Sequence, residues 1–120
     1  MASAPSNPVV HLELHTPDVI AACEFYRRLC GWDPERIDPA YERYRAIEVG
    51  EEIGGSVVEC STPRPTWMPY VEVGSVERAT KRAQSLGAAV LLEPREGPAG
   101  WRSAVASPAG GEMAFWQPKQ

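Results

Sequence analysis

An internal repeat constrains the fold of this chain more than any other feature of its sequence. In Val9–Trp32 the first eight residues alternate between apolar and polar, the period-two pattern of a strand with one covered face. Thr16 then predicts a helix cap, Pro17 and Asp18 suit the first turn, and Gly31 predicts the stop. The strand's polar face carries His11, Glu13 and His15, and the predicted buried stripe of the helix is Ile20, Cys23, Phe25, Tyr26 and Leu29.

Met68–Ala89 shows the same succession of strand, cap, helix and stop. Ser75 predicts the cap and Gly87 the end of the helix. Its predicted buried stripe consists of Val76, Ala79, Ala83 and Leu86. Each copy is followed by further strand-like segments, so the chain reads as a duplicated βαβββ unit of the α+β class.

The length of 120 residues fits one domain with a core of its own. We expect a flexible tail over residues 1–8 and a single domain over 9–120, with module one at 9–60, a linker at 61–67 and module two at 68–118. After the first helix, residues 33–40 predict an edge strand or an irregular crossing, and 41–49 and 53–60 predict strands. In the second module the predicted strands are 89–93, 101–107 and 112–117.

Charge and cysteine usage narrow the class of partner. The net charge of −4 and a pI near 5.2, without a basic run, argue against nucleic acid. The three cysteines, at spacings unlike a metal site, indicate reduced and mostly buried thiols of a cytoplasmic protein. No stretch resembles a signal peptide or a membrane span, so we expect neither membrane insertion nor a membrane partner.

Four stretches together carry a resemblance to a known superfamily. They are HLELHTPDVIAACEFYRRLCGW, the central IGGSVVE, the repeat YVEVGSVERATKRAQSLGA and the closing SPAGGEMAFWQP. In order and spacing the chain resembles, from about Val9 to Pro118, the vicinal oxygen chelate superfamily, which includes glyoxalase I, extradiol dioxygenases and bleomycin-resistance proteins. The resemblance implies an open, cup-shaped mixed sheet with its helices outside, a small-molecule ligand inside, and commonly a homodimer.

The resemblance also implies where a divalent metal would bind. In metal-dependent members the first and fourth strands of each module supply the ligands, and these positions fall here on His11, Glu59, Met68 and Ala114. A thioether prefers soft ions and an alanine binds none, so we favour neither a metal nor any other cofactor. Glu13, His15 and Glu72 are the possible replacements on the same faces, but strand neighbours two residues apart already stand about 6 to 7 Å apart, too far to reach one ion.

His11 and Glu59 are the candidate catalytic residues, and two interpretations stay open. A carboxylate beside an imidazole fixes its tautomer and makes an acid–base pair, or the two form a polar pair without a reaction. His15 is expected at the surface or as a local cap. Gly54 and Gly55 permit either a bulge or the close approach of another backbone or a ligand.

The candidate ligand-binding residues are mainly aromatic. Large rings on a concave sheet stack on planar ligands, although packing in the core or at a dimer interface is the open alternative. Arg45 and Arg102 would anchor an anionic group unless they are simply solvated. The ligand-binding set comprises Glu13, Trp67, Met68, Tyr70, Glu72, Trp101, Ala114 and Trp116.

Three functions fit these residues. The favoured one is a metal-independent protein that binds a small, partly aromatic or apolar metabolite, for which drug-sequestering resistance proteins are the implied precedent. The second is an isomerase, cyclase or lyase that moves a proton with His11 or Glu59. The third is a metal-dependent enzyme, dioxygenase-like or other, with rearranged ligands.

Overall fold

A computed structural model describes residues 7–35, 44–97 and 99–119. They fall into two compact units, which we call the N-terminal unit, His11–Met68, and the C-terminal unit, Pro69–Gln120 with the residues up to Val10. Most of the predicted tail and parts of the segments predicted at 33–40 and 41–49 lie outside the described residues. Each unit is treated by itself.

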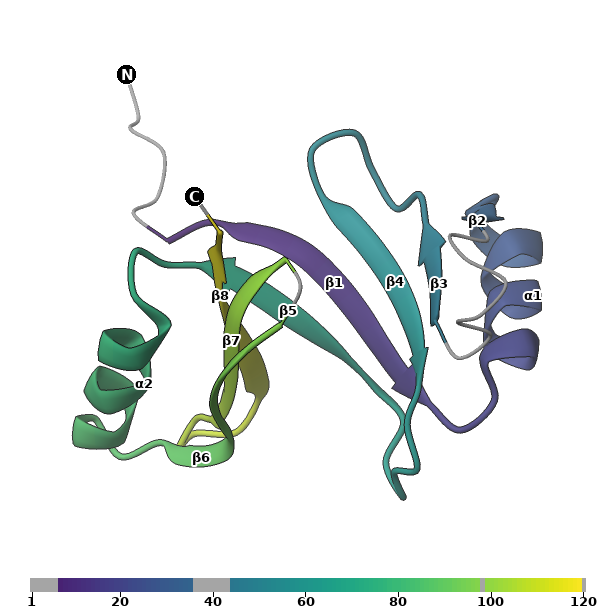
Figure 1. Cartoon of the computed structure of the whole chain (residues 1–120). Helices are drawn as coiled ribbons and strands as arrows, with labels where there is room; N and C mark the ends of the chain where they lie inside the picture. The colour runs from purple at the N-terminus through teal and green to yellow at the C-terminus, as the bar shows by residue number, and fades with distance from the viewer. Residues whose placement is uncertain (1–6, 36–43, 98, 120) are drawn as a thin grey trace. The chain divides into compact units, whose positions relative to one another are not determined.

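The N-terminal unit consists of a helix and a four-stranded sheet (Figure 1). Its strands lie in the order β2-β3-β4-β1. β1 runs parallel to β4, and the other two pairs are antiparallel. Its elements are β1 (Val9–Thr16), α1 (Val19–Cys30), β2 (Pro34–Glu35), β3 (Tyr44–Ile47) and β4 (Gly54–Glu59).

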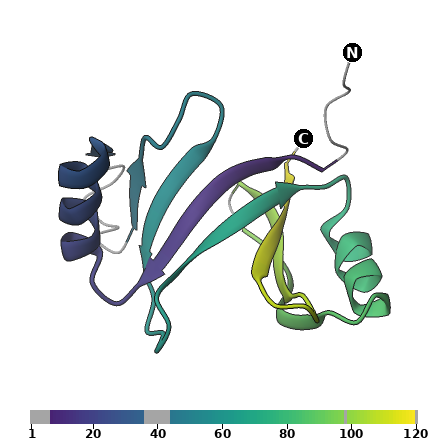
Figure 2. The ribbon, with the colours of Figure 1, turned by 180° about the vertical axis from the view of Figure 1, so that it is seen from behind.

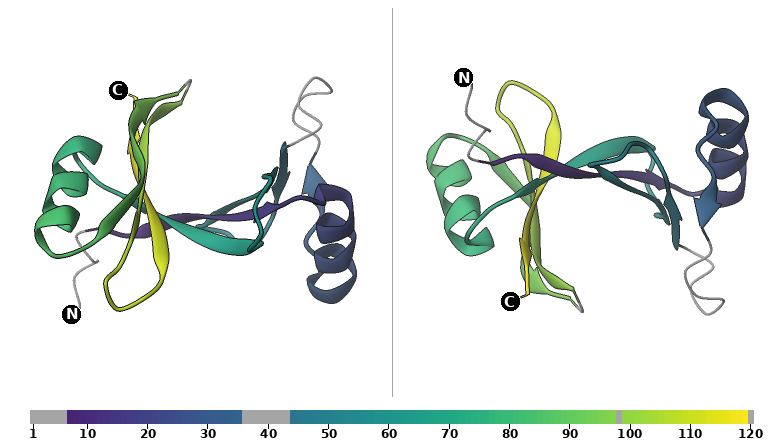
Figure 3. Two further views of the ribbon diagram at one scale, coloured as in Figure 1. Left: turned by 90° about the horizontal axis from the view of Figure 1, so that it is seen from below. Right: turned by 90° about the horizontal axis from the view of Figure 1, so that it is seen from above.

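The C-terminal unit repeats this topology. Its strands lie in the order β6-β7-β8-β5, with β5 parallel to β8 and the other pairs antiparallel. In the views of Figures 2 and 3 each helix lies to one side of the strands of its own unit. The elements are β5 (Thr66–Glu72), α2 (Val76–Ser85), β6 (Ala89–Glu96), β7 (Gly100–Ala106) and β8 (Glu112–Pro118). The predicted duplication of a βαβββ unit is therefore confirmed.

The helix α1 begins two residues later than the sequence pattern suggests. Asp18, not Thr16, is the N-cap, and its carboxylate accepts a hydrogen bond of 2.9 Å from the backbone N–H of Ala21. Thr16 instead accepts from the N–H of Asp18, which fixes the turn into the helix. The end at Gly31 is as predicted, since this residue adopts a φ of 73°, where a Cβ would be strained.

The predicted buried stripe of α1 is mostly wrong. Ile20, Phe25 and Leu29 are 76%, 56% and 67% exposed, whereas Val19 and Cys23 are buried. The face that packs follows the spacing 19, 22, 23 and 26, which fits 3.6 residues per turn. The apolar residues at 20, 25 and 29 fall outside this face.

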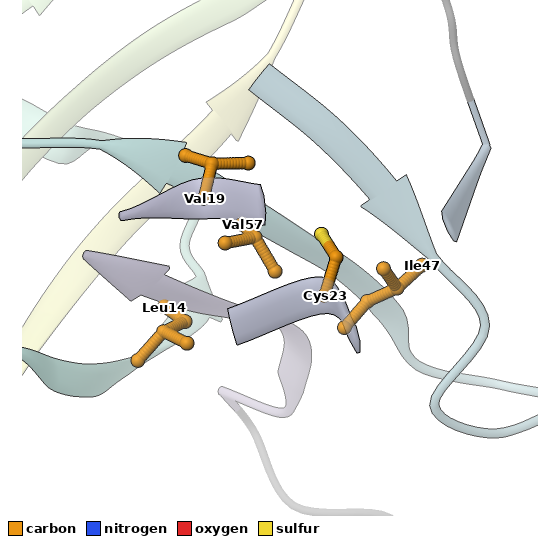
Figure 4. Packing of buried hydrophobic residues seen from close by; sticks show 5 residues of the cluster. All are labelled: Leu14, Val19, Cys23, Ile47 and Val57. Carbon is orange, nitrogen blue, oxygen red and sulfur yellow. The ribbon is translucent and has the colours of Figure 1, made fainter. Parts of the chain in front are cut away.

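The core of the N-terminal unit lies between α1 and one face of its sheet. Figure 4 shows side chains from the helix and from three strands converging there. Val57 is fully buried, and burial of such a side chain contributes roughly 1.5 to 3 kcal/mol. The cluster comprises Leu14, Val19, Cys23, Ile47 and Val57. Of the other thiols, Cys60 is half-buried and Cys30 is exposed, which corrects the expectation that the cysteines are mostly buried.

The helix α2 packs on β6, β7 and β8 through a partly polar contact. Ser75 caps it as predicted, accepting from the N–H of Arg78 at 3.2 Å. Val76 and Thr80 are buried, and Leu86, which the predicted stripe included, is 65% exposed. Under the helix the Thr80 and Ser103 hydroxyls lie 2.7 Å apart. No described helix is long and apolar enough to span a bilayer.

Candidate functional site

Polar side chains converge on the sheet face of the N-terminal unit that faces away from α1. In the parallel register His11 lies opposite Gly54, Glu13 opposite Ser56, and His15 opposite Val58. Because paired residues of neighbouring strands point to the same side, these positions share one face. On β3, Tyr44 pairs with Val58 and so joins them. We call His11, Glu13, His15, Tyr44 and Ser56 the polar cluster.

Ser56 is the centre of the polar cluster. Its hydroxyl lies 2.7 Å from Nε2 of His11 and donates to Oε1 of Glu13 at 3.3 Å. The other carboxylate oxygen of Glu13 lies 3.0 Å from Nε2 of His15. Tyr44 also hydrogen-bonds to Ser56. The Ser56 hydroxyl on β4 therefore links side chains of β1 to a side chain of β3.

These hydrogen bonds determine the tautomer of His11. The Ser56 hydroxyl has a single proton, which it donates to the Glu13 carboxylate. While that proton is directed to Glu13, the 2.7 Å contact with His11 is a donation from Nε2–H to Oγ of Ser56. In the neutral ring Nδ1 is accordingly the basic nitrogen.

Burial sets the charge state of this cluster. Glu13 is 7% exposed and Ser56 is fully buried. Burial lowers the pKa of His11 from its ordinary value, and the nearby Glu13 carboxylate opposes the shift only in part. The pKa of the Tyr44 hydroxyl is raised by burial, lowered by its hydrogen bond to Ser56 and raised by Glu13. The cluster thus holds a neutral imidazole and a neutral phenol near a buried glutamate.

Gly54 makes room for the imidazole of His11. A Cβ at this position would lie 2.6 Å from Nδ1 of His11, closer than such atoms approach. The group that approaches Gly54 is thus a side chain of the neighbouring strand, and neither a bulge nor the expected approach of another backbone or a ligand accounts for it. Gly55 has a different role, because its Cβ would meet the carbonyl oxygen of Ile47 and the side chain of Val49 on the core side.

The structure does not bring His11 and Glu59 together. Glu59 pairs with Thr16 at the far end of the ladder, five positions from the pairing of His11 with Gly54. That separation is roughly 16 Å, and an odd number of positions puts Glu59 on the opposite face. Their expected acid–base pair is therefore wrong in its geometry. The residue of β4 that does contact His11 is Ser56.

The polar cluster does not fit a divalent metal. Among residues 7–35, 44–97 and 99–119, no group of three or more His, Cys, Asp or Glu side chains is placed to hold an ion. His11 directs Nε2 to a hydroxyl, and His15 directs Nε2 to the Glu13 carboxylate. A neutral serine hydroxyl is a weak metal ligand beside imidazole or carboxylate. That this protein uses no metal or other cofactor stays a prediction.

The C-terminal unit carries several of the predicted ligand-binding residues on one sheet face. Tyr70 pairs with Ala114, and Glu72 with Trp116, so these four share a side of the β5–β8 pair. Arg102 of β7 pairs with Trp116 and lies on the same side. Ala114 is buried, whereas Tyr70 and Trp116 are half-buried. That they bind a ligand stays a prediction.

The remaining predicted residues lie elsewhere. Trp67 belongs to the core side of the N-terminal unit, where its Nε1 donates to the Tyr26 hydroxyl at 3.0 Å and its ring meets Trp32 edge-on. Core packing, the open alternative, therefore applies to Trp67. Trp101 pairs with Gln117 and lies on the α2 side of its sheet, opposite to Trp116. Met68 is buried. Arg45 pairs with Val57 and so lies on the helix side of β3.

Sequence reasoning missed Ser56 and Tyr44 and placed His15 at the surface or in a cap. His15 instead contacts Glu13 and is only half-exposed. The alternation of Gly54, Ser56 and Val58 was visible in the sequence, but nothing in it fixes which of these lies beside His11. The register between two strands far apart in the chain supplies that information.

Two curated relatives come from Streptomyces. The chain is 29% identical, over 132 aligned positions, to the anthracycline biosynthesis protein DnrV of Streptomyces peucetius, and 28% identical to the anthracycline biosynthesis protein DauV of Streptomyces sp. strain C5. Each alignment covers 95% of this chain and 48% of the relative. The chain thus spans about half the length of the curated relatives it matches.

Solved structures share the fold at low identity. Methylmalonyl-CoA epimerase from Mycobacterium tuberculosis superposes with a TM-score of 0.66 at 16% identity, covering 100% of this chain and 94% of that one. A glyoxalase/bleomycin resistance protein/dioxygenase superfamily member from Vibrio splendidus gives a TM-score of 0.63 at 17% identity, covering 92% and 98%. These neighbours confirm the predicted fold class.

The family model of the glyoxalase-like domain matches residues 9–116, most of the chain. This match agrees with the duplicated βαβββ topology and confirms the resemblance read from the sequence. The chain belongs to the glyoxalase-like domain family.

Proposed function

We propose that this protein binds a small, partly aromatic or apolar metabolite through the polar cluster of the N-terminal unit, without a conventional divalent metal. The supporting observation is the buried carboxylate of Glu13, held between the Ser56 hydroxyl and Nε2 of His15. Removing a carboxylate from water costs several kcal/mol unless its hydrogen bonds are replaced. A sheet face that is organised around such a group is prearranged to recognise polar atoms of a ligand.

The chemistry of the cluster indicates what the ligand must offer. Glu13 accepts hydrogen bonds, while the hydroxyls of Ser56 and Tyr44 both donate and accept. A planar molecule with phenolic hydroxyl or keto groups supplies the matching partners. The anthracycline biosynthesis proteins among the relatives, which match at 29% and 28% identity, support an aromatic ligand of this kind.

The test is calorimetric titration with an anthracycline, its sugar-free aglycone and simpler hydroxylated anthraquinones. Glu13→Gln and Ser56→Ala are expected to weaken binding by at least about tenfold, because a hydrogen bond to a charged group contributes about 1.5 to 3 kcal/mol. Ser103→Ala is the matched control, since Ser103 is also fully buried but lies in the C-terminal unit. Equal affinities of the wild type and all three variants would show that the cluster stabilises the fold and does not bind the ligand.

A second candidate is an enzyme that moves a proton on the bound ligand. The observation that favours it is the neutral His11 within hydrogen-bond distance of Ser56, which in turn contacts Glu13. A neutral imidazole is the form that accepts a proton in general base catalysis. Isomerase, cyclase and lyase reactions at a carbon next to a carbonyl group begin with such a step.

Incubation of the protein with each bound compound in D2O separates the two candidates. An enzyme would bring deuterium into the ligand or change its structure, and His11→Gln would abolish this even at saturating ligand. A ligand recovered unchanged and free of carbon-bound deuterium from wild type would refute the enzyme and leave the binding protein.

A further inference from the structure

A cavity of about 610 Å³ lies on the helix side of the C-terminal unit, between α2 and the strands. Its wall includes Trp101, which lies on the sheet face opposite to Trp116. This cavity is therefore distinct from the face that carries Tyr70 and Trp116, and it lies wholly within one unit. Its volume falls within the range of about 300 to 1,000 Å³ found for small-molecule sites.

Polar packing between α2 and the sheet, together with the irregular strand β6, explains why the cavity exists. Beneath α2 the contact with the sheet includes two hydroxyls beside the buried Val76, since Thr80 donates to the carbonyl oxygen of Val76 at 2.6 Å and lies 2.7 Å from Ser103. At the edge strand β6 the register shifts between Leu92 and Arg95, around Pro94, which has no N–H for the ladder. The bulge interrupts the regular pairing of β6 with β7, and Pro94 forms part of the cavity wall.

The cavity presents an aromatic surface to solvent. Trp101 is 40% exposed although it is the largest side chain type, and its indole is one of the lining groups. Beside Trp101 on the same sheet face, Gln117 uses its Oε1 to accept from the N–H of Val76 at 2.9 Å. Its amide nitrogen retains two donors. The walls are thus partly fixed before any ligand enters.

The charges around the cavity favour a cation. Three charged side chains line it, and two are acidic: Glu77, Lys81 and Glu93. Lys81 lies 3.9 Å from Glu77 on the exposed side of the same helix, a weak contact that leaves the two close to neutral as a pair. Within the described residues no ion pair to Glu93 is formed. The remaining charge beside Trp101 is negative.

We propose that this cavity binds an organic ammonium ion, with the cation over the face of the Trp101 indole and beside the Glu93 carboxylate. A tryptophan face attracts a cation through its quadrupole, and the carboxylate adds a direct charge interaction. The apolar part of the ligand lies against Pro94 and the indole. This site is independent of the polar cluster and of the function proposed for it.

The test uses choline as the probe and 3,3-dimethylbutan-1-ol as its uncharged isostere. Binding is followed through the indole N–H resonance of Trp101 in a ¹H–¹⁵N NMR titration. Choline is expected to bind in the millimolar range and at least about fivefold more tightly than the alcohol. Equal affinities of the two probes, or no shift of the Trp101 resonance at tens of millimolar choline, would overturn the proposal.

Variants identify the charge preference of the cavity. Glu93→Gln is expected to weaken choline binding roughly fivefold, and Lys81→Gln to strengthen it about twofold by removing a like charge. Glu112→Gln is the control, because Glu112 is an exposed acid on β8 outside the cavity. Weaker binding in Lys81→Gln, or an equal loss in Glu93→Gln and Glu112→Gln, would contradict a cation site. In a Trp101→Leu variant, choline binding is followed through the backbone amide resonances of the cavity residues, and tryptophan fluorescence reports that the variant is folded. Wild-type affinity in this variant would contradict the proposal as well.

Discussion

Replacing Ser56 by alanine tests the polar cluster by its contribution to stability. The substitution removes a hydroxyl that contacts Nε2 of His11 at 2.7 Å and donates to Glu13 at 3.3 Å. A neutral hydrogen bond contributes about 1 kcal/mol and one to a charged group about 1.5 to 3, with the lower value appropriate to the longer contact. We therefore expect a loss of about 2 to 3 kcal/mol.

Ser103→Ala provides the comparison, because both serines are fully buried on strands. Ser103 contacts the Thr80 hydroxyl, which keeps its own donation to the carbonyl oxygen of Val76 when Ser103 is lost. No donor of Thr80 is left unsatisfied, so the expected cost is about 1 kcal/mol or less.

Urea unfolding at neutral pH measures both variants. At a slope of about 1 to 3 kcal/mol per molar urea, the midpoint of Ser56→Ala should fall by roughly 1 M and that of Ser103→Ala by less than half as much. Equal shifts in the two variants, or a larger shift in Ser103→Ala, would refute the argument that the contact with the buried carboxylate makes Ser56 the more important residue.

Further outcomes follow from the same contacts. Gly54→Ala should displace the His11 ring, because the new Cβ would lie 2.6 Å from Nδ1, and the loss of the bond to Ser56 should appear as a changed ring-nitrogen shift by NMR. Burial lowers the pKa of His11 in the folded protein below its ordinary 6.5, so the unfolded chain binds this proton more readily. The contribution of the neutral ring to the free energy of unfolding is therefore complete above about pH 6.5 and is lost as the pH falls below it. His11→Gln should flatten that part of the stability curve between pH 7.5 and 5.5, about the ordinary histidine pKa, in urea titrations, whereas an unchanged slope would contradict the shift. Val57→Ala should cost roughly 2 kcal/mol in thermal or urea unfolding, and Leu29→Lys, at a 67% exposed position, less than about 0.5. A large loss in Leu29→Lys would show that the apolar side of α1 is covered.

The fold could be predicted because the signals for its strands and helix ends are local in sequence. Alternation of apolar and polar residues predicted β1 and β5. Ser75 predicted the N-cap of α2 and Gly31 the end of α1, since each of these signals lies within a few residues of its effect. The helix faces were harder. Leu86 and Ile20 are apolar but exposed, because which side of an amphipathic helix packs depends on the strands beneath it.

The candidate site could be predicted only in part. His11 and Glu13 were identified from the polar face of one strand, and that face is the one where the cluster lies. The partner on β4 was misassigned, because a shift of register by an odd number of residues exchanges Glu59 for Ser56 and reverses the face. A single sequence contains no signal for this register. A cytoplasmic location and a homodimer stay predictions from the sequence.

The most direct test of the central claim is an NMR titration of the histidine ring nitrogens with a hydroxylated aromatic ligand. In the free protein His11 should show the neutral tautomer with its proton on Nε2, donated to Ser56. Ligand addition should shift the ring signals of His11 and His15 in the wild type, and in Ser56→Ala it should do so only at ligand concentrations at least about tenfold higher. A ligand that binds without changing either ring would place recognition outside the polar cluster and contradict the proposed function.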